Sequence, residues 1–428
     1  MTMRVRAGLT MILAVAMMGL ASCDHYNCAS GPNLGTSCTA SGSGIGTTGT
    51  GGSATAAFVF VADAGGTGKT GTIDGYTLNT AVSTFLATPS YIAPTTPLGD
   101  GGVGMVVAQS KYLYTGFKST NTIDGWLIGT DGSLTTLNNS PYPAPFMGLV
   151  PSGFGTQSVI TNPTGTLLFF SNGLDKIYVY QIGSDGSLTT ATGSPFSVPF
   201  SPGNLATDGQ GKYLYITETL SNHTGLEIGA YAIGSTGSLT LVPGSPFAFP
   251  MWQVQGDPTG NFLIGTKGDS AVQGFSGVDN PFLYVFSIAQ SGATAGAITQ
   301  VGSPVATAAS PLSIAVQSNT TGNLVYTFGI EDSQLGFDPV EGYSLSSAGV
   351  LTAVTGSPFT SPANLGDLGQ FDHSGAFMFT YGGILDSSTN TVTYQMGAID
   401  VASGGALTQP TATLTLASGG FFAVADPQ

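Results

Sequence analysis

The sequence predicts an all-β protein: a seven-bladed β-propeller with four antiparallel strands in each blade. Three observations predict it: a phrase that recurs along the chain, four short β-type segments within each recurrence, and two chain ends that are out of phase. The composition agrees, because 64 of the 428 residues are Gly and only 7% are charged. Such a chain favours strands and turns over helices.

The clearest repeat reads QIGSDGSLTTATGSPFSVP over residues 181–199, and close versions begin at Ala232 and Ser344. Weaker versions begin at Leu127 and Ser287. The spacing, about 50–59 residues, is typical of propellers and solenoids. Gly-Ser-Asp-Gly is hairpin-turn chemistry, and the Ser-Pro that follows suits a strand leaving its sheet, because proline cannot donate to a ladder.

Each repeat contains four short segments of β-forming residues. In the third unit they are residues 158–163, 166–172, 176–182 and 187–193, and we call these positions the first to fourth strands. Turn residues separate them, as hairpins require. Seven second-strand and seven third-strand segments occur along the chain. We expect the Phe after each full Ser-Pro to wedge between neighbouring blades: Phe196, Phe247 and Phe359.

The two ends of the repeat region predict how the ring closes. The region begins with a second-strand segment, AAFVFVAD (56–63), and it finishes on a first-strand segment, GGFFAVADPQ (419–428). The C-terminal strand is therefore expected to complete the first blade beside Phe58–Asp63. Closure of this kind removes what would otherwise be two exposed sheet edges, whereas an open solenoid gives no reason for the offset.

Residues 1–22 have the pattern of an export signal. Arg4 and Arg6 precede an apolar run from about Leu9 to Leu20, which is too short to span a bilayer comfortably. The tetrapeptide LASC, which ends at Cys23, resembles the lipobox of bacterial lipoproteins. That resemblance implies cleavage before Cys23 and lipid attachment there, with the protein facing the periplasm or the cell surface. The alternative is an ordinary secretory signal with an incidental cysteine.

Residues 23–55 are dominated by Gly, Ser and Thr, which predicts a flexible tether ahead of a propeller at residues 56–428. Cys28 and Cys38 are the other two cysteines of the chain. A disulfide between them would suit an oxidising compartment, and it would close a loop of the tether only.

Charge excludes some partners. With the signal removed, six Lys and no Arg face 23 Asp and Glu, so the net charge is 6 − 23 = −17. Nucleic acid and anionic lipid headgroups repel such a chain, so we expect no nucleic-acid partner. Membrane attachment would then depend on the lipid. We expect the propeller body to be monomeric.

Several blade motifs resemble those of lactonase-type propellers, the family that includes propeller 6-phosphogluconolactonases and carboxymuconate cyclases. The matching residues are the Pro-x-Gly turns at 162–165 and 257–260, Lys212-Tyr213-Leu214-Tyr215, aromatic third strands such as 177–180, and Gly-x-Leu-Thr fourth strands. The resemblance covers about residues 56–428 and implies ligand binding over the channel. The face it implies carries the second-to-third strand loops and the connections between blades. Members that act on phosphorylated or polycarboxylate substrates are expected to use Arg and His there, and the mature chain has no Arg.

An enzyme hypothesis draws on the long loops of that face. Glu218, His223 and Glu227 could supply a general base and its orienting group for lactone hydrolysis. Lys176 and Lys267 could hold an anionic substrate. The alternative is that all five are solvated loop residues.

A binding hypothesis draws on aromatic residues of the connections between blades. An apolar rim there would suit a protein or glycan partner, and its residues are Phe146, Phe154, Phe200, Phe249 and Trp252. The alternative is that they cap the channel and pack the blade tops. We take a non-catalytic binding module in the cell envelope as the main prediction. A lactone hydrolase is the alternative, and a purely structural envelope component is a third.

A calcium site is the one cofactor that the sequence raises. Four carboxylates fall within eleven residues: Glu331, Asp332, Asp338 and Glu341. Calcium prefers six to eight oxygen ligands on a flexible loop. The segment lacks the Asp-x-Asp-x-Asp-Gly spacing of a calcium loop, and Pro339 interrupts it. No other cofactor is expected, because the chain contains no phosphate-binding loop, nucleophile elbow or zinc-ligand cluster.

Overall fold

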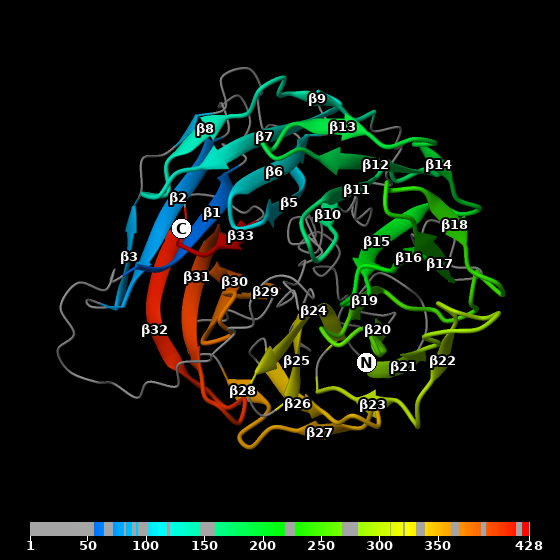
Figure 1. Cartoon of the computed structure of the whole chain (residues 1–428). Helices are drawn as coiled ribbons and strands as arrows, with labels where there is room; N and C mark the ends of the chain where they lie inside the picture. Colours follow the sequence, from blue (N-terminus) through cyan, green and yellow to red (C-terminus); the bar gives the residue numbers. More distant parts are fainter. Residues whose placement is uncertain are drawn as a thin grey trace, which may run out of the picture.

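The structure, a computed structural model, describes most of the chain beyond residue 54. It describes residues 55–63, 72–80, 83–87, 91–92, 102–117, 120–145, 159–218, 227–267, 281–308, 310–319, 322–330, 339–360, 368–386, 391–416 and 422–427. These residues form seven antiparallel sheets arranged in a ring (Figure 1). The prediction of a seven-bladed β-propeller is confirmed. Within the described ranges no helix is long and apolar enough to cross a membrane.

We number the blades in chain order, and each is given from its innermost strand outward. Blade 1 contains β33 (Phe422–Ala425), β1 (Thr55–Asp63), β2 (Thr72–Asn79) and β3 (Thr84–Ala87). Blade 2 contains β5 (Gly102–Ala108), β6 (Tyr112–Phe117), β7 (Thr122–Ile128) and β8 (Leu134–Thr136). Blade 3 contains β10 (Val159–Thr161), β11 (Leu167–Ser171), β12 (Lys176–Ile182) and β13 (Leu188–Thr190). Blade 4 contains β15 (Pro202–Thr207), β16 (Tyr213–Glu218), β17 (Ile228–Ile233) and β18 (Leu239–Leu241).

The remaining three blades repeat the pattern. Blade 5 contains β19 (Gln253–Gly256), β20 (Phe262–Lys267), β21 (Phe282–Ile288) and β22 (Ile298–Gln300). Blade 6 contains β24 (Ser310–Asn319), β25 (Gly322–Ile330), β26 (Pro339–Leu345) and β27 (Leu351–Ala353). Blade 7 contains β29 (Leu368–Phe371), β30 (Phe377–Asp386), β31 (Thr391–Val401) and β32 (Leu407–Leu416). Two-residue strands pair with the third strand of five blades: β4 (Tyr91–Ile92), β9 (Tyr142–Pro143), β14 (Phe196–Ser197), β23 (Val305–Ala306) and β28 (Phe359–Thr360).

The C-terminal strand closes the ring as the sequence predicts. Strand β33 lies antiparallel to β1, with Phe58 opposite Ala425 and Val61 opposite Phe422. Figure 1 shows the red β33 beside the blue β1, so the first blade is assembled from both ends of the propeller. Strand β1 therefore has partners on both sides, β2 and β33, and is not left as an open edge, which removes a site of unwanted strand pairing.

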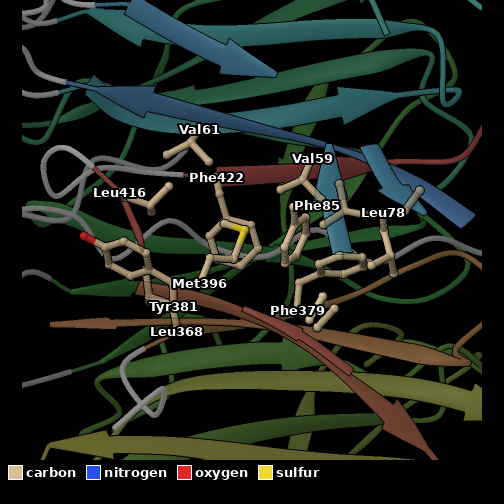
Figure 2. Close-up of a cluster of buried hydrophobic side chains, with 14 residues drawn as sticks. Val59, Val61, Leu78, Phe85, Leu368, Phe379, Tyr381, Met396, Leu416 and Phe422 are labelled. Atoms are coloured by element: carbon tan, nitrogen blue, oxygen red, sulfur yellow. The ribbon is translucent and has the colours of Figure 1, made fainter. Parts of the chain in front are cut away.

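Apolar side chains fill the junctions between blades. The junction of blades 7 and 1 holds a cluster that contains Phe422 of blade 1 and Tyr381 and Met396 of blade 7 (Figure 2). All three Phe residues that follow Ser-Pro pack against such clusters, as the sequence predicts: Phe196, Phe247 and Phe359. The repeated sequence therefore serves packing, because each blade must bury both of its faces against its neighbours.

Asn or Asp side chains hold the turns between first and second strands. In blade 3, Asn162 Oδ1 accepts hydrogen bonds from the backbone N–H of Thr166 and of Leu167, both at 2.8 Å. In blade 4, Asp208 Oδ1 accepts from the N–H of Lys212 and of Tyr213, at 2.6 and 2.7 Å. Burial raises the pKa of the Asp208 carboxyl. An acceptor at this position satisfies N–H groups that the tight turn leaves without a strand partner.

On this same face, Asp426 links three blades. Its Oδ1 accepts from the N–H of His373 in blade 7, and its Oδ2 accepts from the hydroxyl of Ser110 in blade 2, both at 3.2 Å. Asp426 directly follows β33 of blade 1. The side chain therefore reinforces closure on both sides of the last strand.

Candidate functional site

The face opposite Asp426 carries the ends of the second strands. At corresponding register positions, strand β16 of blade 4 ends with Glu218 and strand β20 of blade 5 ends with Lys267. The corresponding residue of blade 3 is Asn172, which directly follows β11. Adjacent blades therefore present a carboxylate and an ammonium at the same level of the ring, on the face that the sequence indicated.

Glu218 and Glu227 face each other across the start of the loop between β16 and β17. The backbone N–H of Glu218 donates to the carbonyl of Glu227 at 3.0 Å. Burial raises the pKa of Glu218, and the negative charge of Glu227 raises it further. Among the described residues, the buried Oε2 of Glu218 has no hydrogen-bond partner. A carboxyl with a raised pKa and an uncommitted oxygen is suited to accept and return a proton.

Thr217 connects this strand end to the next blade. Its Oγ1 accepts from the N–H of Asn204 at 3.0 Å and donates to the carbonyl of Trp252 at 3.4 Å. The N–H of Trp252 in turn donates to the carbonyl of Thr266 at 2.8 Å. Trp252 therefore lies between the residues that directly precede Glu218 and Lys267, and its side chain is half-buried.

Amide side chains join the innermost strands beneath these residues. Asn204 Oδ1 of blade 4 accepts from the N–H of Val254 in blade 5, at 2.9 Å. Gln253 Oε1 of blade 5 accepts from the N–H of Ile314 in blade 6, at 2.8 Å. Sequence reasoning missed both residues. The available signal was a polar amide near the start of a first strand, where the other first strands begin mostly with apolar or small residues.

Lys176 lies apart from this site. Its Nζ donates to Ser197 Oγ at 2.6 Å and forms an ion pair with Asp175 at 3.5 Å. Both partners lie in blade 3, since Ser197 belongs to the short strand β14 and Asp175 directly precedes β12. The neighbouring Asn172 is fully buried, and its Oδ1 accepts from three backbone N–H groups of residues 174–176. These residues shape a loop of the same face.

Three residues of the expected aromatic rim fall within the described part of the chain. Phe200 is buried and lies against Gly229, where a Cβ atom would come within 2.7 Å of its ring. Phe249 packs on Phe286 with ring centroids 4.6 Å apart. Trp252 is the one of the three placed beside Glu218 and Lys267. Phe146 and Phe154 lie outside the described residues.

Both carboxylate oxygens of Glu341 accept hydrogen bonds, one from blade 6 and one from the connection that leads into it. Its Oε1 accepts from the N–H of Ala308 and its Oε2 accepts from the hydroxyl of Tyr343, both at 2.6 Å. In the part of the chain that the structure describes, no three His, Cys, Asp or Glu residues form a group that could hold a metal ion. The other predicted calcium ligands lie outside the described residues: Glu331, Asp332 and Asp338. So do the predicted lipidation site Cys23, the predicted disulfide residues Cys28 and Cys38, and the catalytic candidate His223.

Solved structures share this fold across most of the chain. A protein from Lactobacillus plantarum matches with a TM-score of 0.56 at 15% identity, over 85% of this chain and 99% of its own. A candidate 6-phosphogluconolactonase from Bacteroides fragilis matches with a TM-score of 0.51 at 17% identity, over 84% of this chain and 98% of its own. The periplasmic gluconolactonase PpgL of Pseudomonas aeruginosa matches with a TM-score of 0.54 at 13% identity, over 87% of this chain and 99% of its own. No protein-family model matches the chain, and neither does any curated protein sequence.

The resemblance to lactonase-type propellers therefore holds for the fold. The same neighbours correct the main functional prediction, that of a non-catalytic binding module. Proteins that share this architecture over nearly their whole length include two that are named as lactonases. The binding prediction gave most weight to the missing Arg residues, but an uncharged lactone needs no Arg. The alternative, a lactone hydrolase, agrees better with these names.

Proposed function

We propose that the protein is an exported lactone hydrolase whose site lies over blades 4 and 5, with Glu218 as its catalytic base. The observation that carries the proposal is the state of the Glu218 carboxyl: a raised pKa together with a buried oxygen that has no hydrogen-bond partner among the described residues. An ordinary surface carboxylate is a poor base at neutral pH. Burial and a neighbouring like charge bring its pKa closer to the working range.

The proposed reaction opens the lactone with one water molecule. Glu218 takes a proton from the water as the water oxygen attacks the lactone carbonyl carbon, which gives a tetrahedral oxyanion. The bond between that carbon and the ring oxygen then breaks, and Glu218 returns the proton to the departing oxygen. The product is an open-chain hydroxy acid, and Glu218 is restored as a carboxylate.

Lys267 and Glu227 have supporting roles in this proposal. Lys267 stands at the position of blade 5 that corresponds to Glu218 in blade 4, and its ammonium would stabilise the oxyanion and the carboxylate that replaces it. Glu227 keeps the pKa of Glu218 high by its charge. Lys is a single point charge and cannot bind a phosphate as an Arg fork does, so the proposal favours lactones without a phosphate group.

The test is a hydrolysis assay of residues 24–428 against a panel of lactones with and without phosphate. We expect turnover of uncharged lactones and a loss of at least about 10²-fold in kcat for Glu218→Gln, the scale of general-base catalysis. Asp208→Asn is the matched control, because it alters a buried carboxylate on the opposite face. Absence of turnover across the panel, or equal turnover by the wild type and Glu218→Gln, would overturn the proposal.

Export and lipid anchoring are supported by different observations. One neighbour with this fold is named as a periplasmic enzyme, and residues 1–23 resemble a lipoprotein signal. Mass spectrometry of the N-terminal peptide from membranes should find a lipid-modified Cys23, and Cys23→Ser should release the protein from the membrane fraction. An unmodified peptide that begins elsewhere would reject the anchor.

A further inference from the structure

Thr217, which directly precedes Glu218, joins the end of β16 to two other strands. Its side chain is buried, and its Oγ1 accepts from the N–H of Asn204 at 3.0 Å and donates to the carbonyl of Trp252 at 3.4 Å. Asn204 Oδ1 in turn accepts from the N–H of Val254 at 2.9 Å. Because Trp252 and Val254 are two residues apart in the chain, the three hydrogen bonds form a closed ring across the junction of blades 4 and 5.

Ser171 makes a corresponding contact one blade earlier. It occupies in blade 3 the register position that Thr217 occupies in blade 4, and it is fully buried. Its Oγ accepts from the N–H of Gly173 at 3.1 Å and donates to the carbonyl of Pro202 in blade 4 at 3.0 Å. Pro202 of β15 lies directly opposite Glu218 of β16. Buried hydroxyls therefore bind both the residue that precedes Glu218 and the residue that lies opposite it.

These contacts matter because Glu218 is the last residue of its strand. The ends of strands open more readily than their middles. Burial and the charge of Glu227 raise the pKa of Glu218, and both effects require the carboxyl to stay in place. A displacement of about 1 Å can lower the rate of an enzyme about 10²-fold. The position of this strand end therefore bears directly on the proposed chemistry.

We infer that Thr217 and Ser171 are positioning residues for Glu218: their hydroxyls fix the end of β16 between blades 3 and 5 and so hold the proposed base in place. The inference rests on the proposed lactone hydrolysis for the role of Glu218. The two hydroxyls act on the surroundings of its carboxyl, however, and these can be measured without a substrate.

Carbon-13 NMR of the glutamate carboxyl groups makes that measurement. The chain contains four glutamates, so the spectrum is simple, and Glu218 is the signal that Glu218→Gln removes. Thr217→Val keeps the shape of threonine and removes the hydroxyl. We expect it to lower the pKa of Glu218 by about 0.5 or more, toward the ordinary value of about 4.3, because a loosened carboxyl gains water. Thr217→Ser keeps the hydroxyl and should titrate as the wild type does.

Ser171→Ala tests the other hydroxyl and should lower the same pKa. Thr115→Val is the control for lost stability. Thr115 is equally buried, and its Oγ1 donates to the carbonyl of Gly104 within blade 2 at 3.0 Å. This variant should lose Tm as Thr217→Val does, while the titration of Glu218 stays as in the wild type.

Kinetics supply the second measurement. With a lactone that the wild type hydrolyses, Thr217→Val should lower kcat by about 10-fold or more and move the acid limb of kcat/KM to lower pH. An unchanged pKa of Glu218 in both Thr217→Val and Ser171→Ala would overturn the inference, whether or not a lactone is hydrolysed. An equal fall of that pKa in Thr115→Val would also overturn it. A lowered pKa without turnover of any lactone supports the positioning and rejects the proposed function alone.

Discussion

Replacement of Phe422 by alanine measures how strongly the C-terminal strand closes the ring. Phe422 lies in β33 and is 4% exposed. Figure 2 shows it among Val61, Leu416, Tyr381 and Met396, and its ring centroid lies 6.4 Å from that of Tyr381. The truncation would therefore remove contacts to both blade 1 and blade 7.

The expected loss follows from burial and from the rigidity of the surroundings. Truncation of a buried Phe to Ala costs about 3–5 kcal/mol, the sum of lost transfer free energy and a cavity term. The neighbours of Phe422 come from β1, β30, β31 and β32, and each strand is held in a hydrogen-bonded ladder. Such walls cannot move in to fill the space, so we expect the upper half of that range.

Urea unfolding followed by tryptophan fluorescence and by circular dichroism gives the free energy of unfolding. Val350→Ala is the control, because Val350 is 57% exposed and an exposed truncation should change stability by about 0.5 kcal/mol or less. A loss below about 1 kcal/mol for Phe422→Ala would refute the reasoning, since β33 would then contribute little to closure.

Three further predictions concern the pKa shifts and one close packing contact. Because burial raises the pKa of Asp208, the stability this carboxyl contributes is present below its unfolded pKa of about 3.9 and is lost as pH rises through its folded value. Asparagine is the residue at the corresponding position of blade 3, Asn162. The Tm of Asp208→Asn should therefore fall less between pH 4 and 7 than the Tm of the wild type, and an equal fall in both would contradict this. Glu227→Gln should lower the pKa of Glu218 and move the acid limb of kcat/KM to lower pH, so an unmoved limb would exclude their coupling. Gly369→Ala should destabilise by about 1–3 kcal/mol because its Cβ would meet the Phe328 ring, whereas Gly404→Ala, with open space around it, should not. Equal urea midpoints for these two variants would contradict that contact.

The repeats allowed much of the fold to be predicted because each blade repeats local chemistry. Turn residues such as Asn162 and Asp208, alternating strands and the offset ends are all local signals, and the structure has strands in those places. Phe196, Phe247 and Phe359 likewise occupy the packing positions expected from their recurrence. A propeller suits such reasoning because neighbouring blades contact each other in sequence order.

The site was harder to predict because its parts come from separate blades. Glu218 and Lys267 were named as candidates, but their shared register position and the placement of Trp252 between them depend on strand pairing. Lys176 looked equivalent to Lys267 by residue type, yet its ammonium bonds within blade 3.

For this protein, the sequence alone determined the number of blades, the order of strands and the closure by the C-terminal segment. These properties follow from backbone conformations and apolar patterns that neighbouring residues dictate. Tertiary structure alone decided which carboxyls have a raised pKa and which amides join the innermost strands. Desolvation and hydrogen bonding between blades depend on atoms that are distant in the chain, so no local pattern records them.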